Sequence, residues 1–68
     1  MDITVNGEPR TVAETASVAE LLEALRLAQL EAGVAVCLNG EVVRRADWAS
    51  TRLQPRDELE IVQATQGG

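Results

Sequence analysis

Two Asn-Gly dipeptides, Asn6-Gly7 and Asn39-Gly40, restrict the fold of this 68-residue chain more than any other feature. Asparagine and glycine readily adopt the left-handed backbone angles of a two-residue hairpin turn. Each pair lies between segments that have the character of β-strands. The first pair therefore predicts an antiparallel hairpin made of residues 2–6 and 8–13.

The strand patterns beside the two turns differ. Ile3 and Val5 alternate with polar residues, which is the period of a strand with one buried face. In the second strand, Pro9 cannot donate a ladder hydrogen bond, so we expect it to face outward or to lie near a strand end. The run 34–38 is continuously apolar, which predicts a central strand covered on one face and partly on the other, and 42–43 continues it as a short strand.

One helix is predicted between the two hairpins. Ser17 and Glu20 have the spacing of a capping box, so the helix should begin at Val18. Its buried stripe follows the helical period and consists of Val18, Leu21, Leu22 and Leu25, whereas Glu20, Glu23 and Arg26 should face solvent. The segment 27–33 loses this period, and we interpret it as a fraying end and a connection.

The last third of the chain predicts one more strand and a tail. Residues 44–50 are mostly polar around Trp48, which indicates a turn or a short helical loop, and 54–57 has the composition of a turn. Leu59 and Ile61 then alternate with polar residues in a final strand. The order β-β-α-β-β-β predicts an α+β fold with a mixed sheet of about five strands, a domain at 1–63 and a flexible tail at 64–68.

Composition and charge narrow the functional classes. The formal net charge is −5, which argues against nucleic acid or an anionic membrane as a partner and favours a partner with a basic surface. One cysteine and no histidine give no disulfide and no ordinary metal site. The chain shows no leader pattern and no apolar run of ~18 residues, so we expect a cytoplasmic protein.

A hairpin, a helix across it, two further strands and a final strand describe the ubiquitin-like β-grasp. Within this order, the sequence resembles the family of sulfur carrier proteins of thiamine biosynthesis, with the small subunits of molybdopterin synthase as more distant relatives. The segments that carry the resemblance are Ile3-x-Val5-Asn6-Gly7, Leu38-Asn39-Gly40-Glu41-Val42-Val43, Arg44 or Arg45 followed by Trp48, Asp57-x-Leu59-Glu60-Ile61-Val62, and Gly67-Gly68. Together they cover essentially the whole chain.

Two positions depart from the family pattern. The family usually has glycine before the aspartate of the last turn, where this chain has Arg56, and often has glycine after the helix, where it has Arg26. Both positions concern turns. The expected chemistry of the tail is therefore unaffected.

The resemblance implies a function for the C-terminal carboxylate of Gly68. An E1-like adenylylating enzyme would activate it with MgATP, and sulfur from a cysteine desulfurase system would replace AMP to give a thiocarboxylate. A thiazole synthase would then take the sulfur. Gly67 would let the tail thread into narrow active sites, because glycine has no Cβ and adopts almost any backbone angles. The chain itself would be a carrier rather than an enzyme, a monomer when free, and would bind no cofactor or metal.

Other functions use the same tail chemistry. The chain could serve molybdopterin or cysteine synthesis, although molybdopterin synthase subunits tend to be longer and richer in aromatics, and this chain has no Phe or Tyr. A ubiquitin-like modifier would also need an adenylate, yet this chain has no lysine on which further copies could be conjugated. A bare interaction module with an inert tail is a further alternative.

Three other features have simpler interpretations. We expect Cys37, within the apolar run, to be a small buried core residue. Trp48 should be a packing anchor over the sheet. The acidic residues Asp57, Glu58 and Glu60 should form a solvated strand edge that could also steer a basic partner.

Overall fold

The computed structural model describes residues 1–26 and 33–63. The elements follow the chain as β1 (Asp2–Val5), β2 (Glu8–Thr11), α1 (Val18–Ala24), β3 (Val34–Leu38), β4 (Glu41–Val43), the 3-10 helix η2 (Arg45–Ser50) and β5 (Glu58–Gln63). The predicted order is confirmed, and η2 occupies the segment around Trp48 where a short helical loop was expected. The expected connection lies largely at 27–32, outside the described residues.

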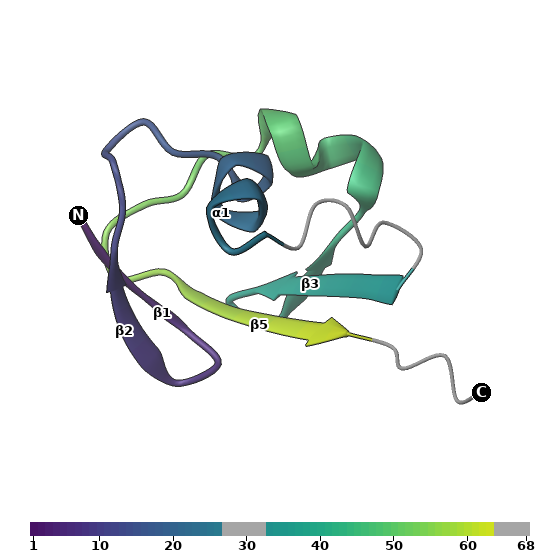
Figure 1. The fold of residues 1–68 in the computed structure, drawn as a ribbon, viewed down its shortest axis with the longest axis horizontal. Helices are drawn as coiled ribbons and strands as arrows, with labels where there is room; N and C mark the ends of the chain where they lie inside the picture. Colours follow the sequence, from purple (N-terminus) through teal and green to yellow (C-terminus); the bar gives the residue numbers. More distant parts are fainter. Residues whose placement is uncertain (27–32, 64–68) are drawn as a thin grey trace.

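The five strands form one mixed sheet with the order β2-β1-β5-β3-β4. β1 pairs with β5 in parallel, and the other three pairings are antiparallel. β5 is therefore the central strand, and β2 and β4 are the edges (Figure 1). Pro9 lies in the exposed edge strand β2, as its missing N–H predicted.

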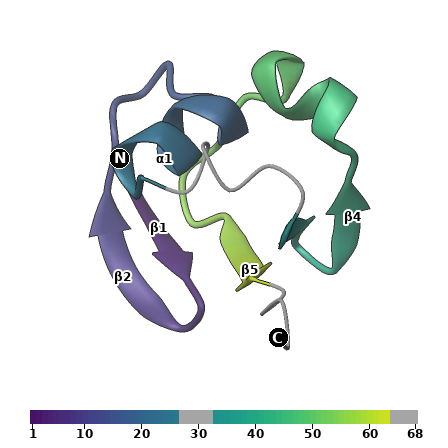
Figure 2. The same cartoon turned by 45° about the vertical axis from the view of Figure 1, so that its right-hand side comes forward.

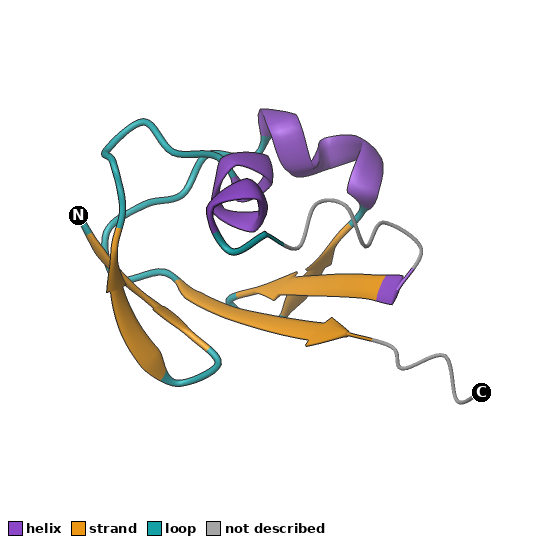
Figure 3. Ribbon diagram, viewed as in Figure 1, coloured by secondary structure: helices purple, strands orange, loops and turns teal. Residues whose placement is uncertain are grey.

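Within residues 1–26 and 33–63, helices cover only one face of this sheet (Figure 3). α1 crosses above the strands, and η2 lies beside it on the same side (Figure 3). Figure 2 shows the same ribbon in a turned view, in which the sheet curves from β2 to β4 beneath both helices. The opposite face has no helical layer among the described residues.

Both Asn-Gly turns have the predicted backbone. Asn6 and Gly7 have φ of 52° and 83°, and Asn39 and Gly40 have φ of 51° and 87°. These left-handed angles suit asparagine and glycine and match the twist of the strands they join. The two hairpins are β1–β2 and β3–β4.

The predicted capping box begins α1. The Glu20 N–H donates to Ser17 Oγ at 3.2 Å, and the Ser17 N–H donates to Glu20 Oε1 at 2.9 Å. Two otherwise unpaired backbone donors are thereby satisfied. The stripe also lies where the period placed it, since Val18, Leu21 and Leu22 are buried.

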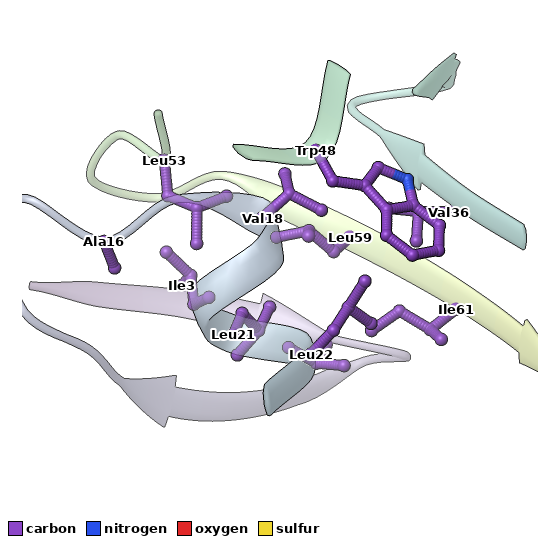
Figure 4. Packing of buried hydrophobic residues seen from close by; sticks show 11 residues of the cluster. Ile3, Ala16, Val18, Leu21, Leu22, Val36, Trp48, Leu53, Leu59 and Ile61 are labelled. Atoms are coloured by element: carbon purple, nitrogen blue, oxygen red, sulfur yellow. The ribbon is translucent and has the colours of Figure 1, made fainter. Parts of the chain in front are cut away.

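One cluster under α1 and η2 forms the hydrophobic core among the residues that the structure describes (Figure 4). Its members are Ile3, Val5, Ala16, Val18, Leu21, Leu22, Val36, Trp48, Leu53, Leu59 and Ile61. Trp48 is buried, which confirms its role as a packing anchor. Leu53 was not predicted; its segment joins the core because the Leu53 N–H donates to the Ala16 carbonyl at 2.9 Å.

The two positions that depart from the family pattern both have left-handed backbones. Arg26, just after α1, has φ of 62°, and Arg56 has φ of 69°. In the predicted turn at 54–57, the Asp57 N–H donates to the Gln54 carbonyl at 3.1 Å. With Pro55 second and a positive φ third, this turn is of the kind that favours glycine at Arg56.

Candidate functional site

β5 is the strand that leads toward the predicted site. Its inward residues Leu59 and Ile61 are buried in the core. The pairing of β5 with β3 continues to the last residue of β5, because Gln63 lies opposite Val34 of β3. The predicted site residues Gly67 and Gly68 lie outside the described residues, so the structure places the base of the tail rather than its end. Their roles stay predictions.

The first residues of β5 are fixed by the second hairpin turn. The Asn39 Oδ1 accepts from the Glu58 N–H at 2.9 Å, and Asn39 Nδ2 donates to Asp57 Oδ1 at 3.0 Å. Asp57 Oδ2 also accepts from the Gln54 N–H at 2.7 Å. Asp57 is therefore engaged in holding two turns together. The expectation that it belongs to a solvated strand edge is wrong.

Glu58 and Glu60 are exposed, as predicted, but β5 is central, so they lie on a face and not on an edge. Leu59 and Ile61 between them point into the core, and alternate strand residues point to opposite faces. The two carboxylates therefore lie on the face that no described helix covers. No ion pair to either is found within the part of the chain that the structure describes.

Cys37 also belongs to this open face. It pairs directly with Glu60 of β5 and Val42 of β4, and it is only partly buried. The expectation that Cys37 is a buried core residue is wrong. The helical layer of the described residues covers one face only, so every second residue of the apolar run points away from it.

A small apolar patch lies beside the two glutamates on the open face. Val42 is 72% exposed and Val62 is 62% exposed, values that are unusual for large apolar side chains in this structure. Val62 pairs with Ala35, which is exposed as well. We name the set Ala35, Cys37, Val42, Val62, Glu58 and Glu60 the open-face patch.

The open-face patch was missed by the sequence analysis. The signal that could have found it is the pairing set by the Asn39-Gly40 turn, which places Val42 opposite Cys37 and Val43 opposite Val36. Because Val36 is buried, Cys37 and Val42 must face the other way. A continuous apolar run hides this alternation.

No group of three or more His, Cys, Asp or Glu residues that could hold a metal ion occurs among residues 1–26 and 33–63. Over the same ranges, no helix is long and apolar enough to cross a bilayer. The arrangement presents a sheet face for contact and a strand that leads to the C-terminus.

A five-stranded mixed sheet with one helix across it, in this order, defines the ubiquitin-like β-grasp class. Comparison with known proteins identifies the family within this class. The model of the ThiS family matches residues 3–68, which includes the last two glycines. The chain belongs to the ThiS family.

Individual relatives cover the whole chain. The sulfur carrier protein ThiS of Escherichia coli (strain K12) is 35% identical over 68 residues, which are 100% of both chains. The crystal structure of the thiamine biosynthesis protein ThiS from Geobacter metallireducens has a TM-score of 0.83 and 46% identity, with 100% of both chains covered. A solution structure of a thiamine biosynthesis protein from that organism has a TM-score of 0.81 and 44% identity over 100% of this chain and 88% of the other.

Proposed function

We propose that this chain is a sulfur carrier of thiamine biosynthesis and that its working group is the carboxylate of Gly68. The observation that carries the proposal is the match of the ThiS family over residues 3–68, which includes the terminal Gly67-Gly68. The relatives named as a sulfur carrier protein and as thiamine biosynthesis proteins match along the full length of this chain. They favour thiamine over the molybdopterin and cysteine alternatives.

The chemistry requires activation by a partner. A carboxylate resists nucleophiles because it is negatively charged and has a poor leaving group. In the proposed first step, a Gly68 carboxylate oxygen attacks the α-phosphorus of MgATP on an E1-like enzyme, and pyrophosphate leaves. A sulfur nucleophile at the oxidation level of hydrosulfide then attacks the carbonyl carbon; it is released from the persulfide of a cysteine desulfurase system by a thiol, which ends in a disulfide. AMP leaves with the bonding electrons, and a thiocarboxylate remains for a thiazole synthase.

The folded part serves this chemistry by recognition. The open-face patch combines exposed valines with the carboxylates of Glu58 and Glu60, and the chain carries a net charge of −5. A partner surface with an apolar centre and basic side chains complements it in both respects. Docking there would hold the folded domain while residues 64–68 reach the partner's active site.

Removal of Gly68 tests the proposal. The shortened chain should keep its melting temperature, because the core of described residues ends at Ile61. Its ATP–pyrophosphate exchange with the adenylylating enzyme should fall to the background rate measured without carrier. Exchange at the wild-type rate would show that the terminal carboxylate of Gly68 is not the group that is activated.

A further inference from the structure

β5 is longer than the strand beside it. β1 pairs with β5 only through Thr4 opposite Glu58 and Val5 opposite Leu59, because the chain then turns at Asn6-Gly7. β5 continues to Gln63. On the side that faces β1, the backbone groups of Ile61 therefore have no strand residue to pair with.

The Asn6 side chain supplies that missing partner. Asn6 Oδ1 accepts from the Ile61 N–H at 2.8 Å, and Asn6 Nδ2 donates to the Ile61 carbonyl at 3.1 Å. The Asn6 backbone N–H also donates to the Leu59 carbonyl at 2.8 Å. A primary carboxamide presents an acceptor and a donor side by side, so the Asn6 side chain satisfies both backbone groups of Ile61.

These bonds form at a sheltered place close to the end of β5. Both side-chain hydrogen bonds are partly buried, so water competes less well for their atoms than at an open surface. Asn6 and Ile61 line a groove of about 230 Å³ that also contains Leu25 and Gln63, the last residue of β5. Beyond Ile61, the pairing of β5 within the described residues comes from β3 alone.

We propose that Asn6 is a positioning residue for the C-terminal tail. By holding Ile61 from the side opposite β3, it fixes the end of β5, to which residues 64–68 are attached. The proposal rests on the proposed function, since it assumes that Gly68 must reach a partner's active site. Without the Asn6 carboxamide, the end of β5 could separate from the sheet, and the Gly68 carboxylate would spread over a larger volume.

Loss of positioning should lower the rate of activation and not the binding of the carrier. Docking depends on the folded domain, so KM should stay near the wild-type value. The carboxylate would occupy the reactive position less often, so kcat should fall about two- to tenfold. This range lies between the small entropic cost of a few additional free residues and the larger loss of rate expected when the carboxylate is fixed in the wrong position. A merely destabilised domain would not separate kcat from KM in this way.

The test uses two matched glycine variants. Asn6→Gly keeps the turn, because glycine accepts the φ of 52°, and removes only the carboxamide. Asn39→Gly does the same at a φ of 51° and removes the contacts to Asp57 and Glu58 at the other end of β5. Each variant is adenylylated with MgATP and the adenylylating enzyme, and amide hydrogen exchange is measured by NMR in the free protein.

Asn6→Gly should speed exchange of the Ile61 amide about tenfold or more beyond any change at the core amide of Leu22, and it should lower kcat at unchanged KM. Asn39→Gly should speed exchange at Glu58 and leave kcat at the wild-type value. Asn6→Asp keeps the acceptor for the Ile61 N–H but places a second acceptor against the Ile61 carbonyl oxygen, so it should also lower kcat at unchanged KM. If Asn6→Gly does not fold, the comparison of Asn6→Asp with wild type tests the role of Asn6.

Wild-type kcat in both Asn6 variants, or an equal loss in Asn39→Gly, would overturn the role of Asn6. If the wild-type chain itself is not adenylylated, the proposed function fails and this inference fails with it. The two failures are therefore distinguishable in one set of assays.

Discussion

The indole Nε1 of Trp48 donates a hydrogen bond of 3.0 Å to the backbone carbonyl oxygen of Val43. Val43 ends the edge strand β4, and Trp48 lies in η2, so this bond joins the short helix to the edge of the sheet. The ring itself is buried in the core (Figure 4). Trp48 therefore closes the side of the core that α1 does not reach.

Trp48→Phe should lower the free energy of unfolding by about 1–3 kcal/mol. Phenylalanine keeps an aromatic ring in the core but leaves the partly buried Val43 carbonyl without its donor. Urea unfolding followed by far-UV circular dichroism measures the effect, since the variant has no tryptophan fluorescence. A loss below about 0.5 kcal/mol would mean that water replaces the indole N–H without penalty.

Leu22→Ala should lower the free energy of unfolding by roughly 2–5 kcal/mol. The side chain of Leu22, which belongs to α1, is 0% exposed, so its truncation leaves a cavity. Val42→Ala is the matched control, because Val42 is 72% exposed on the open face and its loss should stay within about 0.5 kcal/mol. Similar losses in the two variants would contradict the assignment of the two faces.

These assignments show which parts of the fold local sequence can predict. The turn at Asn6-Gly7 and the capping box of Ser17 and Glu20 follow from backbone chemistry within a few residues, and both were predicted correctly. The alternation of Leu59 and Ile61 with polar residues also gave the correct faces of the last strand. Signals of this kind need no knowledge of distant contacts.

Features that depend on which strands become neighbours were not predicted. Cys37 lies on the open face because the only described helical layer covers the other face, and an unbroken apolar run carries no sign of this. The contact between Asn6 and Ile61 joins residues from opposite ends of the chain and requires the parallel pairing of β1 with β5. For Gly67 and Gly68, the sequence and the family supply all that is proposed.

Arg56→Gly should raise the free energy of unfolding by about 0.5–1 kcal/mol. Arg56 has φ of 69°, where a Cβ is unfavourable, and relief of that strain should exceed the added entropy of glycine in the unfolded chain. Arg56→Gln is the control, since it removes the charge and keeps the Cβ. Urea unfolding of both variants separates the two effects, and a destabilised Arg56→Gly would show that this turn carries no backbone strain.

Association with the adenylylating enzyme should slow as salt is added, while dissociation changes much less. Glu58 and Glu60 lie on the open face, and steering by their charges is screened over a Debye length of about 8 Å at physiological ionic strength. In stopped-flow measurements at low salt, Glu58→Gln with Glu60→Gln should associate more slowly than wild type. The control Glu23→Gln, exposed on α1, should behave as wild type. Because the control removes one charge and the test variant removes two, about half the effect in the control would mean that only the net charge matters.

Gly67→Ala should separate folding from function. The methyl group restricts the backbone angles and widens the chain where it enters the partner's active site. The melting temperature should stay at the wild-type value, while kcat/KM for adenylylation should fall on the order of 100-fold if the Gly68 carboxylate is displaced by ~1 Å. Adenylylation at the wild-type rate would reduce Gly67 to a spacer.

The most direct test of the sulfur-carrier function is the intact mass of the chain isolated from cells that make it with its natural partners. The account predicts a fraction of molecules whose mass is raised by the replacement of one oxygen by one sulfur. Tandem mass spectrometry should place that change on Gly68. A chain that carries no such change under thiamine starvation, or that is found joined through Gly68 to lysines of other proteins, would contradict the sulfur-carrier account.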